Sequence, residues 1–183
     1  MSSLPDTDFG QFETLFAYWC RLRDDAGGVP PRLSLDPVAI KELLPNIFLI
    51  ERRAHDDLYV RLSGTAIDAL SPAPMTGANY LDLCMPDTRD FVAESAKLVC
   101  MHPCGNRYKR AVTFEAGGCH EITTAALPMT DRHGAPTYIL GIMSARTDYL
   151  TIAGKPRGYV SVKMLETDFF DVGFGVPETV PSI

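Results

Sequence analysis

Residues 47–70, IFLIERRAHDDLYVRLSGTAIDAL, decide how this chain folds. Two apolar runs, at 47–50 and 58–62, flank a charged segment whose Asp56-Asp57 pair favours a turn. The pattern predicts an antiparallel hairpin followed by a short helix that begins at Thr65. Because apolar and polar side chains alternate in the hairpin, we expect a sheet that is buried on one face.

Three more strands are expected downstream. Residues 108–114 and 119–127 alternate around a turn at 115–118, and residues 137–144 form the last strand. A helix from Asp87 to His102, capped by Asp87, separates the hairpin from these strands. The order of elements predicts an α+β domain with a five-stranded antiparallel sheet and helices on one face.

An amphipathic helix precedes the hairpin. Four aromatic residues recur at helical spacing ahead of two glycines: Phe9, Phe12, Phe16 and Trp19. We favour the packing of this stripe on the domain's own sheet, because most amphipathic helices cover a core. The alternative is that the same four aromatics contact a partner or the second subunit of a homodimer.

The chain divides into three parts. Residues 1–28 carry the amphipathic helix, 29–146 the α+β domain, and 147–183 an extension that is partly irregular and rich in Gly and Pro. Within the domain, Asp36-Pro37 predicts a short helix that leads to the hairpin. Within the extension, residues 157–165 form either one more strand or a partner-binding segment.

Five ordered segments resemble the pattern of a family of small stand-alone bacterial PAS-like proteins. They are Asp36-Pro37, Leu44-Pro45-Asn46-Ile47-Phe48-Leu49, Tyr59-Val60-Arg61-Leu62-Ser63-Gly64-Thr65, Thr76-Gly77 and Leu127-Pro128-Met129. The resemblance spans roughly residues 19–144. It implies a PAS-like fold, a non-enzymatic role in signalling, and a ligand cavity walled by the short helices of residues 65–86.

On this resemblance, a small-molecule site would lie between those short helices, the helix at 87–102 and the inner face of the sheet. The expected ligand-binding residues are Arg61, Met75, Tyr80, Phe91, Leu98, His102 and Arg110. Arg61 and Arg110 would donate hydrogen bonds to a small acidic ligand. Against this, charged strand residues usually face solvent, and that interpretation is favoured for both arginines.

Composition excludes several classes. The 183 residues carry a formal net charge of −6, which argues against a nucleic-acid surface. No apolar run reaches the length of a membrane span, and no signal-peptide pattern opens the chain, so we expect a cytoplasmic protein. The five cysteines are expected to be reduced thiols.

Cofactor chemistry is weakly supported. A minority interpretation is a zinc site in which thiolates and imidazoles converge, drawn from Cys100, His102, Cys104, Cys119 and His120. A haem role for His102 resembles that of some PAS domains, but a lone histidine at a helix end more often acts as a cap. Flavin-adduct photochemistry is disfavoured, because Asn79 is followed by Tyr80-Leu81-Asp82 and not by a cysteine.

We therefore expect a sensory protein without enzymatic activity that binds an unidentified small molecule and signals through contact with an unidentified protein. The alternative is an adaptor or dimerisation module whose core is filled by side chains. A third class, an enzyme, would need an acid–base pair inside the cavity, and the candidates are Asp68, Asp82 and His102.

Overall fold

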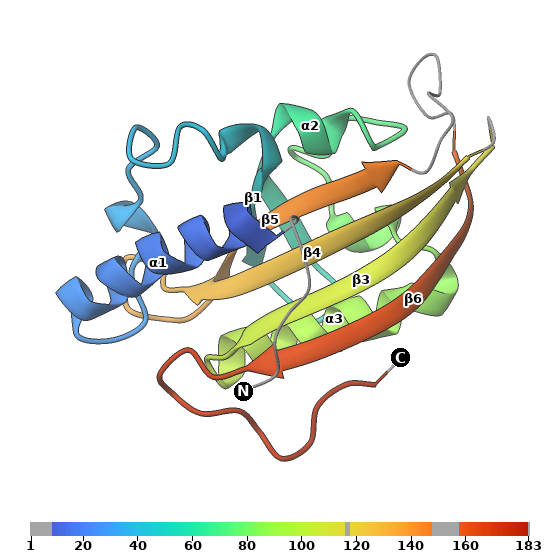
Figure 1. Cartoon of the computed structure of the whole chain (residues 1–183). Helices are drawn as coiled ribbons and strands as arrows, with labels where there is room; N and C mark the ends of the chain where they lie inside the picture. The colour runs from blue at the N-terminus through green and yellow to red at the C-terminus, as the bar shows by residue number, and fades with distance from the viewer. Residues whose placement is uncertain (1–8, 116–117, 148–157, 183) are drawn as a thin grey trace.

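The computed structural model describes residues 9–115, 118–147 and 158–182. Within these ranges the chain forms a six-stranded antiparallel sheet with helices on both faces (Figure 1). The elements in chain order are α1 (Phe9–Ala26), η1 (Arg32–Ser34), η2 (Leu44–Asn46), β1 (Ile47–Arg52), β2 (Leu58–Ser63), α2 (Thr65–Asp68), η3 (Tyr80–Leu83), α3 (Pro86–Met101), β3 (Gly105–Phe114), β4 (Cys119–Met129), β5 (Tyr138–Thr147) and β6 (Tyr159–Phe170).

The predicted hairpin is confirmed. Strands β1 and β2 are antiparallel, with Leu49 opposite Leu62 and Glu51 opposite Tyr59, and α2 begins at Thr65 as expected. The expectation of a sheet buried on one face is wrong at β1. Phe48 lies in the core on the α3 side, whereas Ile47 lies in the core on the α1 side. β1 is an interior strand with layers on both faces, so successive side chains at its start are buried on opposite faces of the sheet.

The sheet has six strands and not the expected five. Its order is β2-β1-β5-β4-β3-β6, and β6 comes from the extension that was predicted to be partly irregular. β6 pairs with β3 along almost its whole length, from Gly105 opposite Phe170 to Phe114 opposite Tyr159. Without β6, the backbone of the ten-residue strand β3 would form an open edge, which proteins usually protect.

Two predicted helix starts need correction. α3 begins at Pro86, in the first helical position that suits proline, and its N-cap is Met85 and not Asp87. The expected short helix after Asp36 is replaced by a series of turns, in which Ala39 N–H donates to the Asp36 carbonyl at 3.1 Å. Pro45 follows so soon that the segment is too short for a stable α-helix.

Two cores lie on the two faces of the sheet. On one face α1 packs over β4 and β5, and Leu15 and Trp19 are fully buried there. The indole Nε1 of Trp19 donates a hydrogen bond of 2.8 Å to the carbonyl of Pro128 on β4. On the other face α3, α2 and η3 cover the sheet and enclose the larger core. The sheet therefore separates the N-terminal helix from any site under α3.

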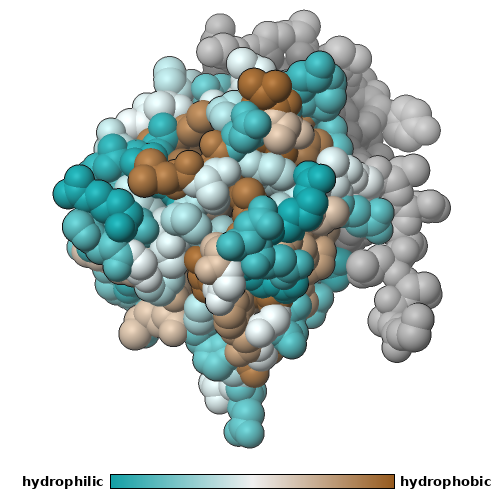
Figure 2. Space-filling view, turned by 90° about the vertical axis from the view of Figure 1, so that its left-hand side faces the viewer, coloured by the Kyte–Doolittle hydropathy of each residue, from teal (hydrophilic) through white to brown (hydrophobic). Residues whose placement is uncertain are grey.

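The end of the molecule at the left of Figure 1, next to the turns between α1 and β1, has a mixed surface. In Figure 2 small hydrophobic patches alternate with hydrophilic side chains on this face and do not form one continuous apolar area. Isolated exposed apolar side chains are normal on protein surfaces. This face alone therefore does not indicate a binding site.

Candidate functional site

A cavity of about 50 Å³ lies between α3 and the inner face of the sheet. One wall is α3, with Val92, Ser95, Ala96 and Val99 facing inward at helical spacing. The strands and the loop before η3 supply the other walls, with Phe48, Ile50, Leu58, Val60, Met75, Ala126 and Ile139 among the lining residues. The cavity is larger than the roughly 10–15 Å³ that one water molecule needs.

Small side chains on facing elements create this space. Ala96 on α3 and Ala126 on β4 both line the cavity and are almost fully buried. Larger apolar residues at these two positions would fill the gap between the helix and the sheet. The cavity thus follows from side-chain size at two buried positions.

Three buried hydroxyl groups in the walls lack a partner within the described chain. The Oγ atoms of Ser63 and Ser95 and the Oγ1 atom of Thr124 have no hydrogen-bond partner among the described residues. A buried polar atom without a partner costs stability, and native proteins rarely leave such atoms unpaired. The three hydroxyls are therefore available to polar atoms of a molecule inside a mainly apolar cavity.

A second cavity of about 30 Å³ adjoins the first. Four residues line both spaces and form the partition between them: Ile67, Met75, Tyr80 and Met143. The second space extends toward the start of α3 and toward β6, where Thr88 and Tyr159 contribute to its wall. The two cavities together form one divided interior site.

Arg110 of β3 enters the second cavity. Its Nη1 atom donates a hydrogen bond of 2.9 Å to the hydroxyl of Tyr80, and its Nη2 atom lies 3.8 Å from the sulfur of Met143. Its Nε atom is completely buried and has no partner among the described residues. No carboxylate of the described residues forms an ion pair with this guanidinium.

Two ionisable neighbours of Arg110, Tyr80 and Cys84, are neutral at physiological pH. Burial raises the pKa of Tyr80 well above its usual range, and burial raises the pKa of the Cys84 thiol to about 11. Arginine itself stays protonated in proteins. Among the described lining residues, the second cavity therefore holds one positive charge and no negative charge.

The structure brings together three of the predicted ligand residues. Met75, Tyr80 and Arg110 line the cavities. The expectation that Arg110 faces solvent is wrong, because it lies on the same face of β3 as Tyr108 and Val112, which are buried.

The other predicted ligand residues lie elsewhere. Arg61 is exposed and forms an ion pair of 2.6 Å with Glu51. Its side chain therefore faces solvent, as the preference of charged strand residues predicted. Phe91 is buried against Tyr108 and lines neither cavity. Leu98 and His102 also line neither cavity, and His102 is exposed as the C-cap of α3. Of the inward face predicted for this helix, residues 91, 95, 98 and 102, Ser95 lines the first cavity and the other three line neither cavity.

Sequence reasoning expected Ser95 to face inward, together with Phe91, Leu98 and His102, but it did not identify a polar lining of the first cavity. Ser95 and Thr124 lie at inward positions between larger apolar residues, one on a helix and one on a strand. A small hydroxyl residue at an inward position is a detectable signal, because the core usually takes an apolar residue there. Met143 was missed because the sequence pattern of a strand does not separate a methionine that lines a cavity from one that packs in the core.

The predicted contact residues of α1 have different environments. Phe12 and Phe16 are partly buried, and both rings meet the ring of Phe170 edge-on, with centroids 5.7 and 5.8 Å apart. Trp19 is fully buried in its own chain, and this agrees with the favoured packing on the sheet. The side chain of Phe9 lies outside the described residues.

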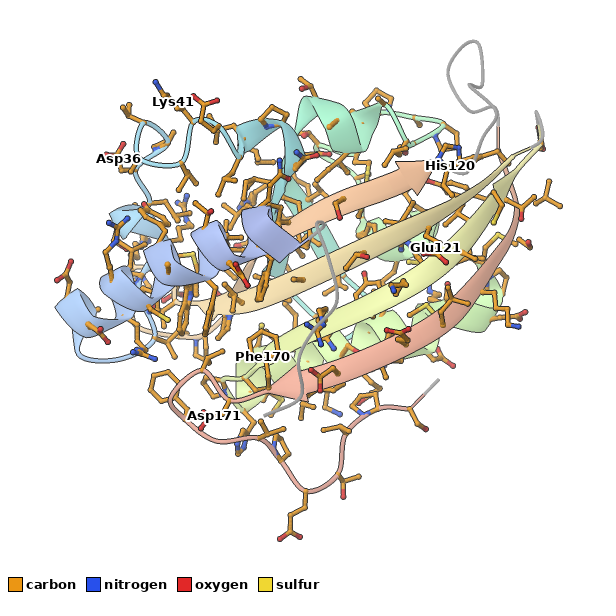
Figure 3. The ribbon with its side chains drawn as sticks, in the orientation of Figure 1. Asp36, Lys41, His120, Glu121, Phe170 and Asp171 are labelled. Carbon is orange, nitrogen blue, oxygen red and sulfur yellow. The ribbon has the colours of Figure 1, made fainter. Side chains whose placement is uncertain are left out.

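The hypothetical zinc ligands do not converge. The described residues contain no group of three His, Cys, Asp or Glu side chains that could hold a metal ion together. Figure 3 shows His120 at the opposite end of the sheet from Phe170, which pairs with Gly105 next to Cys104. Cys100 and Cys104 are buried, whereas Cys119 is exposed.

A sequence model described as PAS domain matches residues 10–144. No curated protein matches the chain. In the described part of the chain, none of the helices has the length and apolar character needed to cross a membrane.

Proposed function

Because this chain belongs to the PAS domain family, which suggests a sensory or signalling module, we propose that it senses a small molecule in the divided interior site. The observation that carries the proposal is the apolar cavity under α3, with three buried hydroxyls that lack partners. A core that serves stability alone would be packed without such a space and without orphaned polar atoms. The proposed role is non-enzymatic.

An enzymatic role has less support. Of the three acid–base candidates, Asp68 accepts a hydrogen bond from the Met75 N–H at 3.3 Å, and Asp82 pairs with Arg89 at 3.3 Å. His102 is exposed at the end of α3. These three residues line neither cavity, so they do not form an acid–base pair around a bound molecule.

The proposed signal passes through the sheet to α1. Ala126 of β4 lines the cavity, while its neighbours Ala125 and Leu127 pack in the core on the α1 side. The next residue, Pro128, accepts the hydrogen bond of Trp19. A ligand that shifts β4 would move α1, provided that it binds the two arrangements with unequal affinity.

The proposed output is contact with a signalling protein or a second copy of the chain. The partly exposed aromatic group of Phe12, Phe16 and Phe170 is the contact surface that we assign on the α1 side. Partly buried aromatic side chains are frequent anchors of protein interfaces. This surface serves equally for a homodimer, with Phe9 extending the same stripe in sequence.

The alternative function is an adaptor or dimerisation module without a ligand. The small size of the cavity, about 50 Å³, is the observation that favours it. In that case the same aromatic surface would make the protein contact, and no molecule would control it.

Native mass spectrometry separates these two functions. The full chain is compared with the variant Ala96→Leu, which fills the cavity from the α3 side. A sensor is expected to retain a small-molecule mass that disappears from Ala96→Leu. Ala17→Leu on the exposed face of α1 is the matched control and is expected to retain the mass. An adaptor would give bare-chain masses for all three proteins, and the subunit count in the same spectra tests the homodimer.

A further inference from the structure

Arg110 is the feature of the interior that packing alone does not account for. A buried charge without a counter-charge is costly, and native proteins normally give it an ionic partner. Among the described residues, the ion pairs involve other arginines, such as Arg61 with Glu51 and Arg107 with Asp168, but not Arg110. In the described part of the chain, the one oxygen that receives a hydrogen bond from this guanidinium is the neutral hydroxyl of Tyr80, at 2.9 Å.

Among the described residues, the donors around Arg110 outnumber the acceptors. The Nε–H of Arg110 has no partner among the described residues. Tyr80 accepts from Arg110 and still carries its own proton, because burial raises its pKa well above the usual range. Both groups therefore offer hydrogen-bond donors in one place, next to one positive charge. This is the chemistry of a site for an oxyanion.

The anion would carry one charge and have a planar head. Arg110 is the one charged side chain among the described residues that line the second cavity. A single guanidinium balances a monoanion, whereas a doubly charged phosphate would retain an uncompensated buried charge. The planar arrangement of the guanidinium donors suits a carboxylate in particular.

The rest of the ligand would be apolar. The second cavity meets the first at Tyr80, whose hydroxyl marks the polar side, and at Met75 and Met143. Methionine side chains are flexible and adapt to neighbouring shapes, so this partition can open to join the two spaces. Beyond it lies the apolar cavity under α3, which the tail of a carboxylate would fill.

We propose that the divided interior site binds a short-chain monocarboxylate, with the carboxylate beside the Arg110–Tyr80 pair, where it accepts from the Nε–H of Arg110 and the hydroxyl of Tyr80, and with the alkyl or aryl tail in the apolar cavity under α3. This assignment rests on the proposed sensory function and adds the chemical class of the ligand. It also explains why the guanidinium lacks a counter-charge within the described chain, because the ligand supplies one.

The test uses pentanoate and pentanamide, which share a shape and differ in charge, and it measures their affinity for the full chain by calorimetry in a carboxylate-free buffer. The wild-type chain is expected to bind pentanoate about tenfold or more tightly than pentanamide. Arg110→Met is expected to abolish this preference, and Tyr80→Phe to reduce it. Lys109→Met, on the opposite face of the same strand where Lys109 pairs with Glu166, is expected to keep it.

Stability provides a second measurement. Arg110→Met removes a buried charge without an ionic partner, so the ligand-free variant is expected to melt at or above the temperature of the wild-type chain. A purely structural arginine would give the opposite result, with a lower melting temperature. Tyr80→Phe keeps the ring in place. If Arg110→Met fails to fold, the reduced preference of Tyr80→Phe for pentanoate over pentanamide provides the test.

The outcomes separate this inference from the proposed function. Equal affinity of the wild-type chain for pentanoate and pentanamide overturns the carboxylate assignment and leaves the sensory function in place. The assignment is also overturned if Arg110→Met binds pentanoate as the wild-type chain does. If neither probe binds, a mass retained in native spectra overturns only the carboxylate assignment, whereas bare-chain spectra overturn the sensory function as well.

Discussion

The indole of Trp19 donates a hydrogen bond of 2.8 Å to the carbonyl of Pro128, and so joins the N-terminal helix to the fourth strand across 109 positions of sequence. Both groups are buried. The bond holds α1 on the face of the sheet opposite the cavity. In the proposed signalling route, a movement of β4 would reach α1 through this hydrogen bond.

Replacement of Trp19 is expected to loosen this attachment. Trp19→Phe keeps an aromatic ring but leaves the buried Pro128 carbonyl without its donor, which costs about 2 kcal/mol of unfolding free energy. Urea unfolding measures the loss. The control is Gln11→Ala on the same helix, which removes a hydrogen bond between two exposed side chains, Gln11 and Asn46, and is expected to cost less than about 0.5 kcal/mol. Equal losses in the two variants would contradict the proposed attachment.

Gly141 of β5 is expected to tolerate no side chain. A Cβ atom at this position would overlap the ring of Phe48 and would lie 2.6 Å from the backbone oxygen of Ala125. The ring could move, but the backbone oxygen belongs to the paired strand β4. Gly141→Ala is therefore expected to lower the unfolding free energy by about 3 kcal/mol.

Gly10→Ala is the matched control, because a Cβ atom at Gly10 would have no heavy atom within 4 Å. Gly10 lies in the first turn of α1, where alanine is expected to be neutral or to stabilise by up to about 1 kcal/mol. A normal melting temperature for Gly141→Ala would show that β4 and β5 separate more easily than this packing implies.

Asp171 is expected to make stability depend on acidic pH. Its Oδ1 atom accepts hydrogen bonds from the N–H groups of Gly173, Gly175 and Phe174, at 2.6, 2.8 and 2.9 Å, and these bonds lower the pKa of the carboxyl. A carboxyl whose pKa is lowered by folding stabilises the protein above its unfolded pKa of about 3.9. This stabilisation is lost as pH falls through the lowered pKa of the folded state.

Melting curves between about pH 6 and pH 2 measure this effect. Asp171→Asn is expected to melt lower than the wild-type chain at neutral pH, and the difference is expected to shrink as the pH falls. Figure 3 places Asp171 next to the end of β6, where the guanidinium of Arg23 also donates to the Val172 carbonyl at 2.8 Å. A difference that is constant over the whole pH range would exclude a contribution from this carboxyl.

The five thiols are expected to react at very different rates. Cys119 is exposed, whereas burial raises the pKa of Cys84 to about 11 and that of Cys100 to about 12. A rise of two pKa units above the ordinary value of 9.0 lowers the thiolate fraction about 100-fold. Alkylation of the native chain, followed by peptide mass spectrometry, is therefore expected to modify Cys119 first and Cys84 and Cys100 only after unfolding. Rapid alkylation of Cys84 would show that the second cavity opens to solvent.

Much of the fold was predictable because its signals are local. The hairpin, the amphipathic helix and the strands from β3 to β5 each follow from alternation or helical spacing within a few residues. The sixth strand was left open because the signals in residues 157–165 were weak. Its formation depends on the unpaired edge of β3, which lies far away in sequence.

The candidate site was predictable only in part. The alternation of β3 already placed Arg110 on the same face as Tyr108 and Val112, but the general preference of arginine for solvent argued against a buried position. On α3, the predicted inward face contained Ser95, which lines the cavity, but Phe91 and Leu98 each lie one position before the lining residues Val92 and Val99. An error of one residue turns a helix by about 100°, enough to exchange a lining face for a covered one.

The sequence by itself determined which segments become strands and helices, and in what order, because side-chain periodicity acts over neighbouring residues. Only the tertiary structure decided the rotation of α3, the burial of Arg110 beside Tyr80 and the addition of β6 to the sheet. These features depend on which distant surfaces meet, and on the space that remains between facing small residues such as Ala96 and Ala126. Close packing, which settles such contacts, is a property of the whole core and not of any one segment.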